Sequence, residues 1–124
     1  GSASDDFGKL ANFADRGAHK LPFPRNTKVK DGGAVSVAPG RYKPNAWGLY
    51  DMHGNVGEWT LSDYKAYPYV ATDGRNAAKA DSPKVVRGGS WHDLPRFGAS
   101  AHRRTYQSYQ KVFDIGLRVV CEVE

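Results

Sequence analysis

The sequence of 124 residues is poor in cysteine and has no long run of apolar residues. Its single cysteine, Cys121, cannot form an intrachain disulfide, so cysteine usage does not reveal the redox compartment. Because Cys121 follows the segment 117–120, which is mostly apolar, we expect it to end a buried strand. No stretch approaches about 18 apolar residues, the length that a membrane-spanning helix needs, and no charged-then-apolar leader opens the chain. The sequence therefore predicts neither a membrane span nor a signal peptide.

Several catalytic signatures are also missing. The sequence contains no phosphate-cradling glycine loop, no His-Glu-x-x-His, no Gly-x-Ser-x-Gly and no zinc-type spacing of cysteines. The sequence therefore lacks the motifs by which an independent hydrolase or kinase is usually identified.

Positive charge is only in modest excess. The 18 Lys and Arg against 13 Asp and Glu give a net charge of +5 and a pI near 9.4. Such a balance permits contact with phosphates, sulfates or acidic glycans, but the scattered basic residues are also typical of an ordinary solvated surface. The basic and aromatic stretch 96–113 has residues that could stack on bases, yet the charge is low for that role. We expect no nucleic-acid partner.

What the sequence does contain is turn-forming residues. There are 14 Gly and 7 Pro, and the length leaves room for one domain. Short strands are predicted at 34–37, 84–87 and 115–121, and the polar segment 62–83 is predicted to be irregular. Because the strands are scattered among loops rather than alternating with long helices, the pattern favours an irregular, loop-rich α+β domain with little regular secondary structure.

Three spaced motifs are distinctive. Residues 44–59 read Pro-Asn-Ala-Trp-Gly-Leu-Tyr-Asp-Met-His-Gly-Asn-Val-Gly-Glu-Trp, residues 87–91 read Arg-Gly-Gly-Ser-Trp, and residues 115–118 read Ile-Gly-Leu-Arg. Together and in order they resemble the formylglycine-generating enzyme, or sulfatase-modifying factor, superfamily. The resemblance covers essentially the whole chain and implies a variant of the C-type-lectin-like fold.

The family domain is considerably longer than this chain. The resemblance therefore implies that residues 1–124 form the C-terminal half of one domain. Its N-terminal half would be absent or carried by a separate chain that completes the fold, and the chain would be truncated, nicked or genetically split.

The resemblance also implies two calcium sites built on loops. In the first, the ligands are the side chains of Asp51 and Glu58 and the carbonyls of Gly54 and Val56. Two carboxylates seven residues apart meet only if the chain curls, which Gly54 and Gly57 permit, and oxygen is the ligand that Ca²⁺ prefers. The alternative is that Asp51 and Glu58 are capping or surface groups.

The second implied calcium site joins two more loops. Its ligands are the Asn12 side chain, the Phe13 carbonyl, the Asp31 side chain and the Gly33 carbonyl, with water completing the shell. The alternative is an Asx-turn followed by a tight turn, which needs the same residue types.

The catalytic part of the family pattern is missing. Members that generate formylglycine have two cysteines after the Gly-Gly-Ser-aromatic turn, and these thiolates bind copper(I), which carboxylates do not replace. No register of the segment 92–104 supplies a cysteine, and Cys121 lies beyond the last motif. The resemblance therefore implies a domain without formylglycine-generating activity.

The corresponding surface of other branches of the superfamily binds ligands or substrates. Candidates for such a surface here are His92, Asp93, Arg96, His102, Arg103 and Tyr106. The two histidines are also a conceivable metal pair, although a third ligand of matching spacing is absent. Arg87, Arg103 and Arg118 lie in or near the motifs and fit either a clamp for an anionic ligand or internal ion pairs.

Two functions remain open, and with them the question of whether the chain is part of an enzyme. The first is a calcium-stabilised module that binds a protein, a peptide or a glycan. The second is the substrate-binding half of an enzyme of another branch, similar to the sulfoxide synthases, in which iron is supplied by another part.

Overall fold

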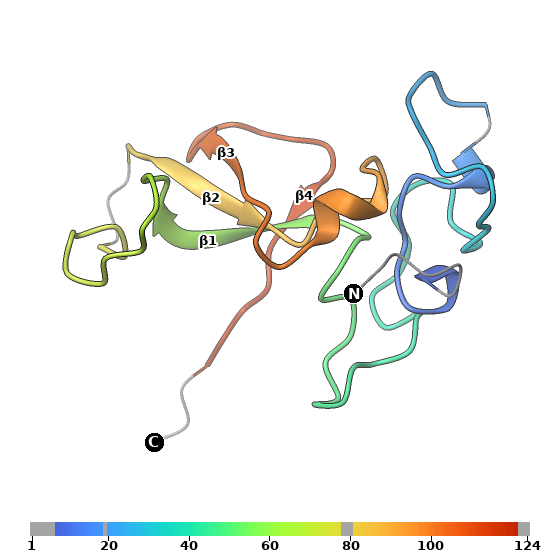
Figure 1. Cartoon of the computed structure of the whole chain (residues 1–124), viewed down its shortest axis with the longest axis horizontal. Helices are drawn as coiled ribbons and strands as arrows, with labels where there is room; N and C mark the ends of the chain where they lie inside the picture. The colour runs from blue at the N-terminus through green and yellow to red at the C-terminus, as the bar shows by residue number, and fades with distance from the viewer. Residues whose placement is uncertain (1–6, 19, 78–80, 122–124) are drawn as a thin grey trace.

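A small mixed sheet forms one side of the molecule and irregular loops form the other (Figure 1). The computed structural model describes residues 7–18, 20–77 and 81–121. We call residues 7–56 the loop region and residues 57–121 the sheet region. The strands are β1 (Gly57–Asp63), β2 (Pro83–Arg87), β3 (Arg104–Gln107) and β4 (Ile115–Gly116).

The sheet has the order β3-β2-β1-β4. β2 is antiparallel to both β1 and β3, and β4 lies parallel to β1. The strand predicted at 84–87 is confirmed, whereas β1 and β3 were not predicted. Most positions of β1 are half-buried, so buried and exposed residues do not alternate along it. Alternation of this kind is the signal by which a strand is usually predicted.

The helices in the described residues are all short 3-10 turns, namely η1 (Phe7–Lys9), η2 (Arg16–Ala18) and η3 (Pro95–Gly98). None of them is long or apolar enough to cross a membrane. The expectation of a loop-rich domain with little regular secondary structure is confirmed, and its regular part is a small mixed sheet with few helices.

The prediction of a strand at 34–37 is wrong, because these residues form no strand. The backbone groups of Val37 bond to a side chain instead, because Asn55 Nδ2 donates to the Val37 carbonyl and Val37 N donates to Asn55 Oδ1. Asn12 Nδ2 likewise donates a hydrogen bond to the Val35 carbonyl. Side-chain amides thus satisfy backbone groups that a neighbouring strand would otherwise satisfy.

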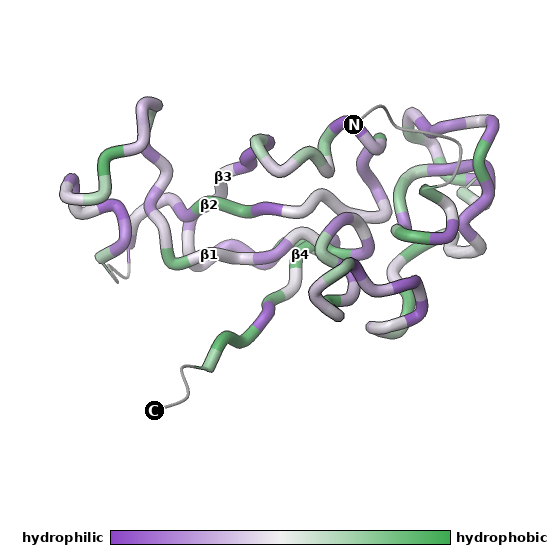
Figure 2. The backbone as a smooth tube through the Cα atoms, turned by 60° about the horizontal axis from the view of Figure 1, so that its bottom comes forward, coloured by the Kyte–Doolittle hydropathy of each residue, from purple (hydrophilic) through white to green (hydrophobic). Residues whose placement is uncertain are grey.

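The closing strand predicted at 115–121 is regular only at its first two residues. Residues 117–121 extend from the sheet as a mostly apolar tail, which is coloured mainly as hydrophobic in Figure 2. The expectation that Cys121 is buried is wrong, because no strand of the described residues covers this side of β4 and Cys121 is exposed.

The interior is unusually polar for a chain of this size. Among the described residues eight apolar and nine polar or charged residues are buried. The apolar ones include Val85 and Val86 of β2 and Phe13 of the loop region. Because a buried polar group costs free energy unless it is bonded, the arrangement of hydrogen bonds and charges decides much of this fold.

Candidate functional site

The loop that runs from Asp51 into β1 curls tightly. Three of its residues have the left-handed backbone conformation, with φ of 52° at Asp51, 73° at Gly54 and 62° at Asn55. The predicted role of Gly54 in the curl is confirmed. Gly57 has a different role, since a Cβ there would lie 2.7 Å from Arg104 Nη2 and 2.9 Å from Val86 Cγ1. The missing side chain of Gly57 makes room for packing rather than for the curl.

The curl brings all four residues of the first predicted calcium site to one pocket of about 160 Å³. The Asn55 carbonyl accepts a hydrogen bond from Trp91 N at 2.9 Å, whereas those of Gly54 and Val56 accept none of the backbone hydrogen bonds found outside the strands. The two carbonyls that the resemblance assigns to the metal are thus the two without such a donor among the described residues.

The two carboxylates of this pocket are in different situations. Asp51 Oδ2 accepts a hydrogen bond from Gly40 N at 2.7 Å, while Asp51 Oδ1 is buried and has no hydrogen-bond partner among the described residues. Glu58 is bound through both oxygens by Arg118, whose Nη2 lies 2.6 Å from Glu58 Oε1, and this hydrogen bond raises the pKa of Arg118. One carboxylate of the pocket is thus neutralised and the other is not.

The residues of the second predicted site also lie close together. Asp31 Oδ2 accepts from Phe13 N at 2.9 Å, and Asp31 Oδ1 accepts from Gly33 N at 2.7 Å. Asn12, which is 1% exposed, has a buried Oδ1 without a partner, and a Cβ on Gly33 would lie 2.9 Å from that atom. The bond from Gly33 N to Asp31 is the Asx-turn that the sequence allowed. A turn of this kind leaves lone pairs on the same carboxylate, so it is compatible with metal binding.

A further carboxylate, Asp15, lies beside this site and was not among the predicted ligands. It is 0% exposed, its Oδ1 accepts from Gly17 N at 2.6 Å, and its Oδ2 accepts from Asp31 N. Burial, with a smaller contribution from Asp15, raises the pKa of Asp31 to about 6 against the effect of the Gly33 and Phe13 hydrogen bonds. The signal in the sequence is an acidic residue three positions after Asn12.

The two sites touch through the amides of Asn12 and Asn55. Asn55 N donates to the Asn12 carbonyl at 2.8 Å, and Asn12 Nδ2 lies 3.4 Å from Asn55 Oδ1. A Cβ on Gly54 would overlap the same Asn12 carbonyl. The loops that carry the two sites are therefore packed backbone against backbone, and ordering one orders the other.

The donors of both sites fit a hard cation. They are carboxylate, amide and carbonyl oxygens, which is the set that Ca²⁺ takes, and each site contains one buried oxygen that lacks a hydrogen bond. No group of three or more His, Cys, Asp or Glu residues in the described residues is arranged to hold a metal. Each predicted site has at most two such side chains, because carbonyls and an amide supply the other oxygens.

The predicted ligand-surface residues have different neighbours. The His92 ring lies among Phe23, Trp91 and Phe113, with centroid distances of 4.3, 5.6 and 5.4 Å. The His102 ring lies instead against Phe97 at 5.1 Å. The two histidines thus belong to different aromatic groups.

The remaining four candidates are also divided between different surroundings. Arg96 is exposed above the Phe97 ring, and Tyr106 lies on β3 against Trp59. Asp93 turns inward, where its Oδ2 accepts from Ser90 N and lies 3.4 Å from Arg104 Nη1. Arg103 lies over the rings of Tyr64 and Tyr67. Of the six residues, Asp93 therefore has a mainly structural environment.

Comparison with known proteins gives the family. The chain matches the model of the sulfatase-modifying factor enzyme 1-like domain over residues 3–123. The chain therefore belongs to this family. Over 83 residues it is 40% identical to the inactive C-alpha-formylglycine-generating enzyme 2 of Bos taurus, an alignment that covers 65% of this chain and 23% of the bovine protein.

Solved structures with a similar fold are known. The fold is similar to that of PvdO from Pseudomonas aeruginosa, with a TM-score of 0.69 and 28% identity over 89% of this chain and 38% of PvdO. Treponema denticola variable protein 1 is similar in fold alone, with a TM-score of 0.66 and 23% identity over 94% of this chain and 37% of that protein. The chain thus spans less than a quarter of the bovine relative and less than two fifths of each solved structure.

The expected absence of the catalytic cysteine pair follows from the sequence itself. Cys121 is the only cysteine of the chain, and it lies in the exposed tail beyond β4. A copper(I) site of two thiolates cannot be built from one cysteine.

Proposed function

We propose that this chain is the calcium-stabilised C-terminal portion of a domain that has no formylglycine-generating activity and serves as a binding module. The observation that carries the proposal is the pair of unpartnered buried oxygens, Asn12 Oδ1 and Asp51 Oδ1, one in each predicted site. A buried oxygen without a hydrogen bond costs about 1–3 kcal/mol. A bound cation would remove that cost at both places.

The charges of the loop region support the same proposal. Asp15 and Asp31 are buried, yet neither they nor Asp51 forms an ion pair with a described residue. Buried carboxylates are normally paired with a cation or coordinate a metal. Calcium would be held by the eight groups predicted from the sequence, with Glu58 shared between the ion and Arg118.

The binding-module part rests on the missing cysteines and on the relative whose name describes it as inactive. A scaffold of ordered loops on a small sheet is a common way to present a ligand surface, since loops tolerate sequence change. We also propose that the complete domain has a C-type-lectin-like fold. A protein, peptide or glycan is the class of ligand that such a surface would take.

The test of the calcium proposal is thermal unfolding in excess calcium and in excess EDTA, with bound ions counted by native mass spectrometry. A metal bound only by the folded state stabilises it by about 2.7 kcal/mol at a hundred times its dissociation constant. We expect two ions per chain and a lower Tm in EDTA. An unchanged Tm together with no bound calcium would sink the proposal.

Two variants assign the ions to their sites. Asp31→Asn and Asp51→Asn should each remove one calcium and reduce the difference in Tm between calcium and EDTA. Asp81→Asn removes the same charge from an exposed residue outside both predicted sites and should keep both ions. Loss of calcium from all three variants alike would point to non-specific binding.

A complementary polypeptide is the partner we propose for the exposed apolar surface. Trp47 is 85% exposed, and Leu117, Val119 and Val120 of the tail are 73%, 81% and 85% exposed. Apolar surface of this kind usually marks an interface. Because the chain spans less than two fifths of the structures it resembles, the rest of the domain is the occupant that best fits this surface.

Hydrogen exchange tests this pairing. The amides of residues 117–121 should exchange rapidly in the isolated chain and become protected when the upstream part of the domain is supplied as a second chain. The amides of β2, which is already paired on both sides, serve as the internal control. Unprotected amides at 117–121 in a stable complex would contradict the pairing.

A further inference from the structure

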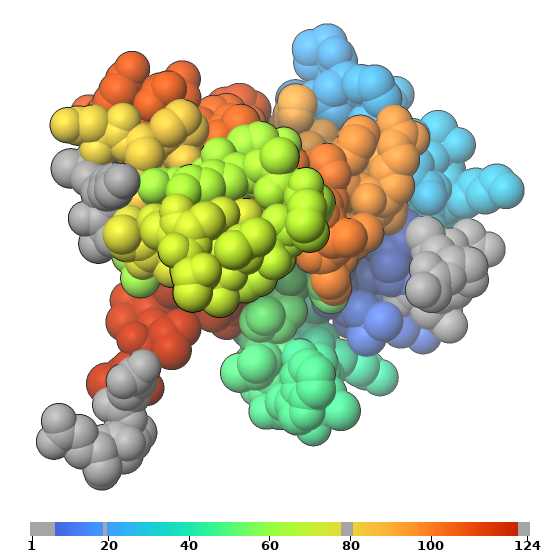
Figure 3. All heavy atoms as spheres, turned by 60° about the vertical axis from the view of Figure 1, so that its left-hand side comes forward, coloured from blue at the N-terminus to red at the C-terminus, as the bar shows by residue number. Residues whose placement is uncertain are grey.

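A second pocket, of about 90 Å³, lies beside β1 and β2 under the segment 64–77. Figure 3 shows the surface of this segment in yellow-green, next to the orange surface of η3. The pocket is lined by tyrosine and arginine side chains from three separate parts of the chain, including Tyr67, Tyr69, Arg75, Arg87 and Arg103. None of the groups of the two predicted calcium sites lines it.

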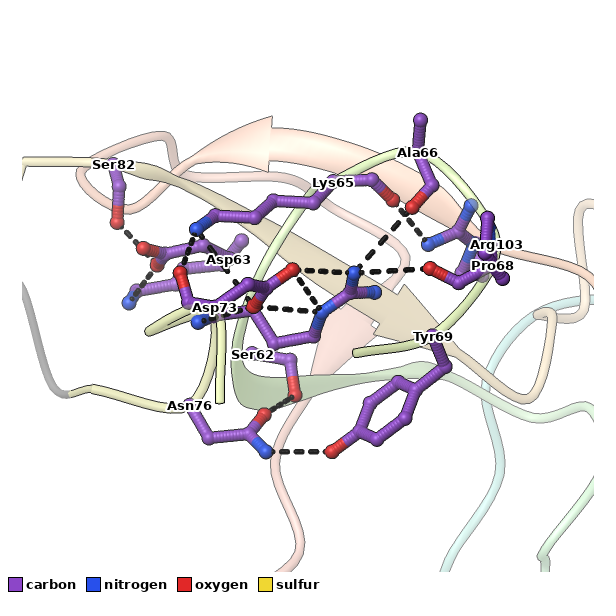
Figure 4. A network of polar contacts seen from close by, with 12 residues as sticks. Ser62, Asp63, Lys65, Ala66, Pro68, Tyr69, Asp73, Asn76, Ser82 and Arg103 are labelled. Atoms are coloured by element: carbon purple, nitrogen blue, oxygen red, sulfur yellow. Dashed lines mark hydrogen bonds and ion pairs between the residues drawn. The ribbon is translucent and has the colours of Figure 1, made fainter. Parts of the chain in front are cut away.

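Arg75 builds the wall of this pocket and is not available to a ligand. It is 3% exposed, its Nη2 lies 2.6 Å from Asp73 Oδ2, and the same nitrogen reaches the carbonyls of Ala66 and Pro68 (Figure 4). The guanidinium also lies over the Tyr69 ring. These contacts hold the irregular segment 64–77 in one shape.

Arg103 and Arg87 are in a different situation. Arg103 Nη1 donates to the Lys65 carbonyl at 2.8 Å, and its guanidinium carbon lies 3.9 Å from the centroid of the Tyr67 ring. Arg87 Nη1 donates to the carbonyls of Ser100 and His102 at 2.8 and 3.1 Å. Both arginines thus bind neutral carbonyls, and neither forms an ion pair with a described residue.

Both arginines have donor atoms that the described residues do not use. Each guanidinium uses Nη1 for the backbone, while Nε and Nη2 of Arg87 and Arg103 donate to no acceptor in the described residues. The Nε and Nη2 pair is a fork that binds two oxygens of one anion. The one carboxylate that lines the pocket, Asp63, is already bound by Lys84 Nζ at 2.6 Å. The pocket therefore has positive charge without an internal counter-ion.

We propose that this pocket binds a tetrahedral oxyanion, the sulfate or phosphate group of an ester. Two guanidinium forks can bind two edges of a tetrahedral anion, whereas a planar carboxylate is satisfied by one fork. The ring of Tyr67 supplies an apolar surface for the carbon next to the ester oxygen. The proposal goes beyond the function above, because it needs neither calcium nor the complementary polypeptide.

The first experiment titrates the unaltered chain, without added calcium, with inorganic sulfate and follows the arginine Nε–H signals by NMR. We expect saturable shifts at Arg87 and Arg103 and none at Arg75 or Arg96. Because this measurement uses the unaltered chain, it does not depend on whether a variant folds. Equal shifts with sodium chloride at matched ionic strength, or no saturation, would overturn the proposal.

Variants then test the two forks. Loss of a charged hydrogen-bond pair weakens binding about tenfold or more, so Arg87→Gln and Arg103→Gln should each raise the dissociation constant for sulfate by that factor. Arg96→Gln is the matched control, since Arg96 is exposed, stacks on Phe97 and carries the same charge. Wild-type affinity in both pocket variants would reject the site.

Two esters separate a free anion from an ester group. Glucose 6-sulfate and O-phosphoserine are compared with inorganic sulfate under the same conditions. Tighter binding of either ester, lost in Tyr67→Ala, supports the apolar contact with the tyrosine. Weaker binding of both esters than of inorganic sulfate would reject the ester part of the proposal.

Discussion

The loop region and the sheet region treat their charges in opposite ways. Every ion pair between described residues joins two residues of the sheet region. The loop region has Lys and Arg as well, yet its Asp15, Asp31 and Asp51 bond to backbone N–H groups instead. Side chains of the chain itself neutralise one region, and we propose that a bound cation neutralises the other.

This difference shows how a domain with little regular structure can be held together. In the sheet region Asp114 Oδ2 accepts from Ser90 Oγ at 2.6 Å and from Arg104 Nη1 at 3.0 Å. In the loop region the corresponding tie is the contact between the Asn12 and Asn55 amides next to the two proposed ions.

The largest effect is expected in the sheet region from Asp114→Ala. Asp114 is 2% exposed, and its removal leaves Arg104 with only the longer contact to Asp93. Breaking a buried pair in this way costs about 3–5 kcal/mol. Urea unfolding should show this loss equally in calcium and in EDTA. A loss that appears only in calcium would mean that the two regions are not separate.

A smaller loss is expected in the loop region from Gly54→Ala. Gly54 has φ of 73°, and an added Cβ overlaps the Asn12 carbonyl, so the variant combines backbone strain with a clash and should cost about 2–3 kcal/mol. Gly48→Ala is the control, because Gly48 has φ of 75° but open space around it. It should lose only the conformational part, about 1 kcal/mol.

The two glycine variants are compared by calcium titration as well as by unfolding. Gly54→Ala should weaken calcium binding, since it displaces Asn12 from Asn55, whereas Gly48→Ala should not. Equal calcium affinities in the two variants would show that the contact between the loops does not organise the sites.

The smallest effect is expected from acid in the segment 64–77. The hydrogen bond from Arg75 lowers the pKa of Asp73 to about 2 from its ordinary 3.8. A lowered pKa stabilises the fold above the ordinary value, and this contribution is lost as the pH falls from about 4 to about 2. Asp73 is on the surface, so the change will be slight. Tm measured between pH 6 and pH 2.5 should fall less steeply in Asp73→Asn than in the unaltered chain, and identical slopes would contradict the pKa shift.

Much of the arrangement of the loop from Asp51 to Glu58 could be predicted from the motif order. Asp51, Gly54, Val56 and Glu58 line one pocket as predicted, because a short curl of chain is determined by its own glycine and by residues that tolerate the left-handed conformation. The strand at 84–87 was also predictable from its local run of apolar residues.

Other features depend on partners that are distant in the sequence. The segment 34–37 has strand-forming residues, but the side chain of Asn55 forms hydrogen bonds with the backbone of Val37. The residues around 34–37 in the sequence do not indicate this contact. Arg118 pairs with Glu58 across 60 residues, although the sequence allowed a ligand clamp as well. The exposed Cys121 follows from the lack of a neighbouring strand, which the apolar pattern of the tail does not reveal.

The sequence by itself therefore determined the family and the missing cysteine pair, and it predicted four residues that line one pocket, since each depends on residue identity and short spacing. Only the tertiary structure decided which of those oxygens remain without a partner and which arginines keep a free fork. These properties depend on every group that comes within hydrogen-bond distance, and long-range contacts bring those groups together.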